Sequence, residues 1–106
     1  MKLKALMVFL LLSVSASSYA WDAVTNGKIN IIEMEKGGPY SFRIWLKDAP
    51  PLCGNANKWA YLDYQSPNYD ALVSALMSAK FADADVKIYA NVSQQNYCEI
   101  GHIQVW

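Results

Sequence analysis

The residues best suited to chemistry in this sequence are aromatic and cationic side chains that recur at every second position of two short segments. They are Arg43, Trp45 and Lys47 in the segment 40–47, and Trp59 and Tyr61 in the segment 58–64. Because successive side chains of a β-strand point to opposite sides, each set would share one face of a strand. Aromatic faces stack on sugar rings and attract cations, and tryptophan is enriched at protein interfaces. The pattern therefore predicts a surface for a glycan or for another subunit; the alternative is that the rings complete a small core.

Groupings that could carry out catalysis are sparse. His102 is the only histidine, and the sequence identifies no partner for it as a general base. No serine lies in a G-x-S-x-G pattern, and Gly37-Gly38 leads into a strand rather than into a phosphate-binding helix. Asp83 and Asp85 lie in the short connection between the expected helix and the next strand, which favours solvated turn residues over paired catalytic carboxylates. We therefore predict a protein that is not an enzyme and that needs no cofactor.

The two cysteines, Cys53 and Cys98, are the only ones in the chain. An even pair in an exported protein is typically joined in a disulfide. A metal site is the alternative, but two isolated cysteines and the distant His102 make a poor set of ligands. We expect a disulfide and no metal.

The first twenty residues have the pattern of a bacterial signal peptide. Lys2 and Lys4 precede the apolar run 5–14, and small residues suited to signal peptidase lie within 18–20. The apolar run is shorter than the roughly twenty residues that span a bilayer, although a retained membrane anchor is the alternative. We expect a mature chain of residues 21–106, secreted or periplasmic, with no membrane span.

The charge of the mature chain argues against a nucleic-acid partner. Without Lys2 and Lys4, the basic residues fall from 9 to 7 against 9 acidic residues, which gives a net charge of −2. Nucleic-acid binding relies on clustered lysine and arginine side chains, and no such block is present. The length of residues 21–106 is enough for a single small domain.

Hydrophobic alternation and turn residues divide the mature chain into five strands and one helix. The strands are expected at 23–35, 40–47, 58–64, 86–92 and 98–106, and the helix at 66–82. In the segment 40–47 the side chains expected to face the core are Tyr40, Phe42, Ile44 and Leu46. Gly101, inside the last strand, predicts a bulge or a close approach of another group to the backbone.

The expected helix has a start signal and two distinct faces. Ser66 is suited to the N-cap position and Pro67 to the first helical position. One face is apolar and is expected to pack on the strands. A second, narrower stripe of small residues would either face solvent or contact a neighbouring helix in an assembly. This stripe is formed by Ala71, Ala75 and Ala79.

Three strands, a helix and two strands form the order of an OB-fold, a small five-stranded and partly open Greek-key barrel. A disulfide from the loop before the third strand to the start of the fifth would tie this barrel where it closes. The alternative is an open antiparallel α+β sheet with the helix packed on one face. Periodicity alone does not separate the two.

Two stretches carry a resemblance to a known family. WAYLDYQSPNYDALVSALMSAKFADADVKIYAN at 59–91, followed by YCEIGHIQVW at 97–106, resembles the binding subunits of bacterial AB5 toxins. The most similar groups are the subtilase-cytotoxin B-subunit-like and the pertussis-like B-subunit-like proteins. The resemblance covers about Val24 to Trp106 as a pattern of strands and turns.

The resemblance implies an OB-fold, secretion, assembly into a homo-oligomeric ring (a pentamer) and binding of a glycan or glycoprotein. It identifies no sugar-contacting residue by position. Because many relatives of these subunits are stand-alone proteins, the alternative is a monomeric periplasmic interaction or inhibitor-type protein without catalysis.

Overall fold

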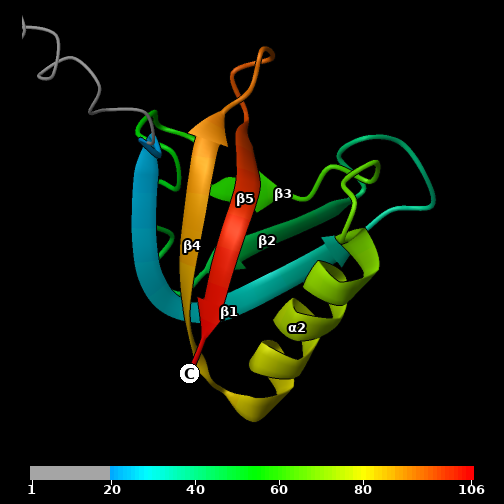
Figure 1. Ribbon diagram of the computed structural model, residues 1–106. Coiled ribbons are helices and arrows are strands. Elements are labelled where there is room, and N and C mark those ends of the chain that lie inside the picture. Colours follow the sequence, from blue (N-terminus) through cyan, green and yellow to red (C-terminus); the bar gives the residue numbers. More distant parts are fainter. Residues whose placement is uncertain (1–19) are drawn as a thin grey trace, which may run out of the picture.

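The computed structural model describes residues 20–106, so the expected signal peptide lies outside the described residues except for Ala20 (Figure 1). The elements are β1 (Ala23–Met34), β2 (Phe42–Leu46), β3 (Trp59–Tyr61), α2 (Tyr69–Ala82), β4 (Asp85–Val92) and β5 (Cys98–Val105). The predicted order of three strands, a helix and two strands is therefore confirmed.

The five strands form a closed barrel with the order β1-β2-β3-β5-β4. Neighbouring strands are antiparallel, except that β3 and β5 run parallel where the barrel closes. Helix α2 connects β3 to β4 and packs mainly against β1 at one end of the barrel (Figure 1). This is the arrangement of an OB-fold, and the open-sheet alternative is wrong.

Strand β1 bends and thereby pairs with two neighbouring strands. Its first half pairs with β4, and its second half pairs with β2. The pairing with β2 shifts between Ile29 and Ile31, which is the signature of a β-bulge. Ile29 is buried and Ile32 packs against the core, whereas Ile31 is 47% exposed. The bulge explains why the apolar residues of this strand do not alternate cleanly.

The core lies inside the barrel and beneath α2, and alternate residues of each strand supply it. It contains Ile29, Phe42, Ile44, Leu46, Ala60, Leu62, Leu76, Ala79, Val86, Ile88, Ala90, Cys98 and Ile100, together with the loop residues Leu52 and Cys53. The predicted inward face of β2 is confirmed for Phe42, Ile44 and Leu46. Tyr40 lies before the strand and is only half-buried, so its prediction as a core residue is wrong.

The segment between β3 and α2 differs most from the sequence prediction. β3 ends at Tyr61, and the chain then turns, with the Ser66 amide donating to the carbonyl of Asp63 at 3.0 Å. The side chain of Asp63 accepts from the amide of Gln65 at the same distance, 3.0 Å, which fixes this turn. The helix therefore begins at Tyr69, and neither Ser66 nor Pro67 holds the predicted capping position.

Gly101 meets both expectations for a glycine inside a strand. Tyr89 pairs with His102 and Ala90 with Ile100, so Gly101 is the extra residue of a β-bulge. A Cβ atom at Gly101 would also clash with the ring of Trp21, which packs over this backbone. A side chain at this position would therefore require the ring of Trp21 to move.

Cys53 and Cys98 form the predicted disulfide, with their Cα atoms 5.3 Å apart. The bond joins the loop before β3 to the first residue of β5, directly beside the parallel pairing of Ala60 with Cys98. Its 45-residue sequence separation means that it restricts the unfolded chain strongly.

We expect the double substitution Cys53→Ala/Cys98→Ala to lower the free energy of unfolding by about 3–4 kcal/mol, because the unfolded chain regains the closed loop's entropy. Urea denaturation followed by tryptophan fluorescence measures this difference, with the oxidised wild-type protein as reference. A difference below about 1 kcal/mol would contradict a stabilising role for the disulfide.

Candidate binding site

The predicted aromatic residues of β2 and β3 lie on the outer face of two neighbouring strands. Trp45 pairs with Trp59, and Arg43 pairs with Tyr61. The two indole rings are 6.5 Å apart between centroids and tilted by 44°. Alternation within each strand thus brings four of the five proposed residues to one surface.

Two tyrosines from loops extend this surface. Tyr40, from the β1–β2 connection, contacts the ring of Tyr61 edge-on at 4.7 Å and that of Tyr97 at 5.0 Å. Tyr97, from the β4–β5 connection, lies 4.9 Å from the ring of Trp59. We call Tyr40, Trp45, Trp59, Tyr61 and Tyr97 the aromatic face.

The members of the aromatic face differ in exposure. Tyr61 is only 4% exposed, so its assignment as a surface residue is wrong: the ring of Tyr40 covers it. Trp45 and Trp59 are half-buried, and Tyr97 is 36% exposed. Burial raises the pKa of Tyr61, because a phenolate there would lose its hydration. Tyr61 thus supports the surface from beneath, and the indole rings and Tyr97 form its accessible part.

Arg43 is held by its own strand neighbours. Its guanidinium donates to the Glu33 carboxylate at 2.6 Å, to the Glu35 carboxylate at 3.3 Å and to the Tyr40 carbonyl at 2.8 Å. It also lies 5.7 Å from the ring centre of Trp59. The hydrogen bonds to Glu33 raise the pKa of Arg43 most; burial opposes them with a smaller effect, and the hydrogen bond to Glu35 adds to the rise. Arg43 orders the surface, and its charge is already balanced by two carboxylates.

Lys47 does not belong to the aromatic face. It lies just beyond the end of β2, exposed, with its ammonium 3.8 Å from the Asp83 carboxylate. Lys28 lies 3.1 Å from the Asp85 carboxylate and donates to the Asp83 carbonyl at 2.6 Å. Asp83 and Asp85 are exposed, as expected of solvated turn residues, and they also pair with Lys28 and Lys47 at the end of α2.

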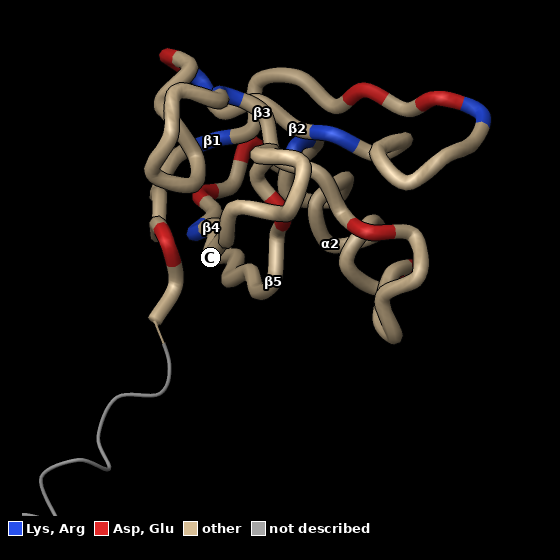
Figure 2. Tube along the Cα trace, turned by 90° about the horizontal axis from the view of Figure 1, so that it is seen from above, with Lys and Arg blue, Asp and Glu red and all other residues tan. Residues whose placement is uncertain are grey.

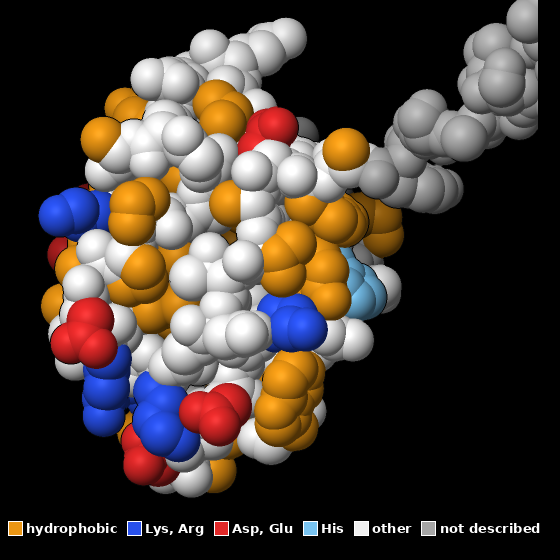
Figure 3. Space-filling model, turned by 90° about the vertical axis from the view of Figure 1, so that its left-hand side faces the viewer, with side chains coloured by type: hydrophobic (Ala, Val, Ile, Leu, Met, Phe, Trp, Pro, Cys, Tyr) orange, Lys and Arg blue, Asp and Glu red, His pale blue; other side chains and the backbone are white. Residues whose placement is uncertain are grey.

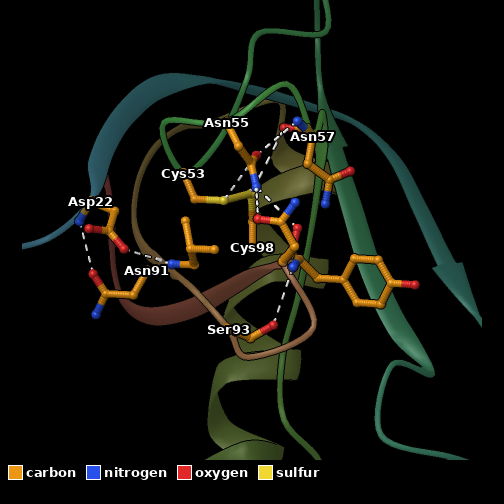
Figure 4. Close-up of a disulfide and its surroundings, with 10 residues drawn as sticks. Asp22, Cys53, Asn55, Asn57, Asn91, Ser93 and Cys98 are labelled. Atoms are coloured by element: carbon orange, nitrogen blue, oxygen red, sulfur yellow. Dashed lines mark hydrogen bonds between the residues drawn. A yellow bond between two sulfur atoms is a disulfide. The ribbon is translucent and has the colours of Figure 1, made fainter.

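The loop before β3 and the β4–β5 loop form an open cleft beside the aromatic face. Figure 4 shows Asn55 and Asn57 of the first loop next to the disulfide. The cleft has a volume of about 290 Å³ and is lined by Asn55, Ala56, Asn57, Asn96 and Tyr97; we call it the amide cleft. Asn55 donates to the Asn96 carbonyl at 3.1 Å and accepts from the Asn57 amide at 2.9 Å. Its side-chain oxygen also lies 3.4 Å from the sulfur of Cys53. Asn55 thus joins two loops at the disulfide.

The alanine stripe predicted on α2 is not one continuous surface. Ala71 is exposed and Ala75 is half-buried, but Ala79 is 2% exposed and belongs to the core. Four-residue steps advance about 40° beyond a full turn of a helix, so the stripe winds from solvent into the barrel. Ala79 is therefore excluded from any contact with a neighbouring helix.

His102 lies in a second aromatic group on the outer side of β4 and β5. Its ring is 4.8 Å from that of Tyr89, and Trp21 stacks on it at 6.5 Å. The single histidine is visible at the edge of the side shown in Figure 3, where hydrophobic side chains alternate with charged ones. The absence of catalysis stays a prediction.

Tyr40 and Tyr97 belong to the aromatic face although the alternation of the strands does not place them there. Tyr40 follows a Gly-Pro turn and lies two residues before β2, and Tyr97 directly precedes β5. A ring at such a position can fold over the strand beside it. Local alternation does not show this, because the two loops meet only when the barrel closes.

Within residues 20–106, no helix is both long and apolar enough to span a membrane. In the same part of the chain, no three His, Cys, Asp or Glu side chains converge as they would around a metal ion. Comparisons of the sequence and fold with known protein families, curated proteins and solved structures find no match.

The raised pKa of Tyr61 predicts a pH dependence of stability. Between about pH 9 and 11 the unfolded chain ionises this tyrosine before the folded protein does, so the free energy of unfolding should fall as the pH rises. Tyr61→Phe should make this decline shallower in urea denaturation at each pH. Tyr64→Phe, at a tyrosine that is 49% exposed, is the matched control. An equal decline in both variants would contradict the prediction.

Proposed function

We propose that this protein is an exported, non-catalytic binding module, resembling the B subunits of AB5 toxins, that holds a glycan on its aromatic face. The observation that carries the proposal is the position of this face on the barrel. It spans β2 and β3 and adds one ring from the β1–β2 loop and one from the β4–β5 loop. OB-folds bind oligosaccharides and oligonucleotides with this part of the barrel.

The charges near the aromatic face favour a sugar over a nucleic acid. Arg43, the cation beside the rings, is neutralised by Glu33 and Glu35. Acidic and basic residues alternate around the rest of the barrel without a continuous basic stretch (Figure 2). Phosphate backbones need several unpaired cations, whereas a pyranose ring needs a flat apolar surface and nearby polar groups.

The rings are also held in place before any ligand arrives. Trp59 contacts Trp45, Tyr61 and Tyr97 with centroid distances of 6.5, 6.4 and 4.9 Å. Because Trp59 packs among these three rings, its indole loses little freedom on binding. A preformed surface of this kind lowers the entropic cost of binding.

We expect Trp59→Ala and Trp45→Ala to weaken glycan binding by about tenfold or more, as central aromatic residues of interfaces do. The measurement is binding of the labelled mature, oxidised protein to a printed glycan array, followed by titration with the strongest binder. Met34→Ala is the control, because Met34 is 58% exposed on β1 and lies outside the aromatic face.

Two results would contradict the proposal. One is the absence of binding to any glycan by the wild-type protein. The other is binding that survives both tryptophan substitutions unchanged, which would put the ligand on another surface.

We also propose that the protein assembles with copies of itself, as the resemblance to ring-forming B subunits implies. Phe81, on the outer side of α2, is 80% exposed, the most of any large apolar side chain in the described residues, and is the side chain of this helix best placed for such a contact. Ala71 is exposed on the same helix and offers room for close approach.

Light scattering of the mature, oxidised protein over a concentration series should therefore give about five times the monomer mass. We expect Phe81→Ser to shift this mass towards the monomer, and Met34→Ser to leave it unchanged. A wild-type monomer at every concentration would contradict assembly and favour the alternative, a monomeric interaction or inhibitor-type protein.

A further inference from the structure

We infer that the amide cleft is a second part of the proposed glycan site, and that it selects neutral, hydroxyl-rich sugars over sialylated ones. The inference rests on the proposed function of the aromatic face. It adds the chemical class of the sugar and names the residues that read its hydroxyl groups.

The amide cleft and the aromatic face are continuous. Tyr97 belongs to both: it lines the cleft, and its ring lies 4.9 Å from that of Trp59. A sugar ring stacked on Trp59 and Tyr97 would therefore place its own edge, or the next sugar unit of the saccharide, beside the asparagine side chains. The volume of about 290 Å³ is just below the range of about 300–1,000 Å³ for small-molecule sites, and the cleft is open to solvent.

The side chains of the cleft have free hydrogen-bonding capacity of the right kind. Asn55 is occupied, because it donates to Asn96 and accepts from Asn57. The side-chain nitrogen of Asn57, in contrast, is buried and has no hydrogen-bond partner within the described residues. A buried donor without a partner is energetically costly, so a ligand that accepts from this nitrogen would remove that cost. Rotation of the amide towards a ligand would break no hydrogen bond of the side-chain nitrogen.

Asn96 adds a second amide to the lining of the cleft, and its side-chain oxygen accepts from Asn55 at 3.4 Å. It is exposed and has a φ of 68°, a conformation that asparagine tolerates better than most residues. Amide groups both donate and accept, and so do the hydroxyl groups of a sugar. The remaining capacity of two asparagine amides in one lining therefore suits adjacent hydroxyl groups.

The charges decide which sugars fit. The lining of the cleft contains amides, a methyl group and a phenol, and no charged side chain. Recognition of a carboxylate normally uses an arginine or lysine, and Arg43 on the adjoining face already donates to two glutamates. A sialic-acid carboxylate would therefore gain no ionic partner from the residues that line the cleft. A neutral sugar needs none.

The test uses the mature, oxidised protein on an array of oligosaccharides, each printed in a neutral form and in a sialylated form. We expect binding to the neutral form to exceed binding to the sialylated form. Asn57→Ala should weaken binding to the best neutral oligosaccharide about tenfold. Its effect on folding should be small, because the lost side-chain nitrogen has no partner in the fold.

Two further variants make the result specific. Asn96→Gly removes the second amide while keeping a residue that accepts positive φ, and it should also weaken binding. Lys58→Ala removes the exposed cation that directly follows Asn57 and should leave binding unchanged. Urea denaturation of each variant checks that the barrel is intact.

The outcomes separate this inference from the proposed function. Preference for sialylated forms, or loss of binding in Lys58→Ala, would overturn the selectivity for neutral sugars. Full binding by Asn57→Ala and Asn96→Gly, with loss in Trp59→Ala, would overturn the role of the cleft and leave the aromatic face standing. Binding to no oligosaccharide would overturn the proposed function, and the inference with it.

Discussion

The barrel depends on the parallel pairing of β3 with β5, where few backbone contacts close a large structure. β3 has three residues, and its pairing with β5 joins Ala60 to Cys98 and Tyr61 to Glu99. The disulfide reinforces this junction directly, because Cys98 is itself one of the paired residues. The same junction brings the β4–β5 loop against β3, so the contact between Tyr97 and Trp59 depends on it. The pairing that closes the barrel therefore also brings the parts of the proposed site together.

Most of the fold follows from short-range patterns in the sequence. Strict alternation in β2 and β4 predicts their buried residues, because a two-residue period has only one inward face. The order of elements and a single cysteine pair then predict the barrel and its disulfide. The exact start of α2 does not follow, since the turn set by Asp63 replaces the cap expected at Ser66. Local hydrogen bonds of a side chain can delay a helix by several residues.

The site was predictable only in part, for a related reason. Alternation places Arg43, Trp45, Trp59 and Tyr61 on one face, but it does not show which rings are covered. Tyr61 is buried by Tyr40, a residue from another loop, and this depends on how the loop folds back over the strand. Lys47 has the same periodicity as Arg43 and Trp45, yet it contacts Asp83 at the far end of α2. The burial of Tyr61 and the position of Lys47 both depend on contacts between segments that are separated in the sequence. The local pattern of side chains does not reveal such contacts.

The position of the two cysteines along the chain has a consequence for biosynthesis. Cys53 leaves the ribosome before α2 and β4, whereas Cys98 opens the last strand of the barrel. During synthesis, Cys53 therefore has no partner cysteine until the helix and β4 have both emerged. A chain truncated before residue 98 keeps Cys53 unpaired and also lacks the strand that closes the barrel. Formation of this disulfide thus requires a chain that already contains the start of its closing strand.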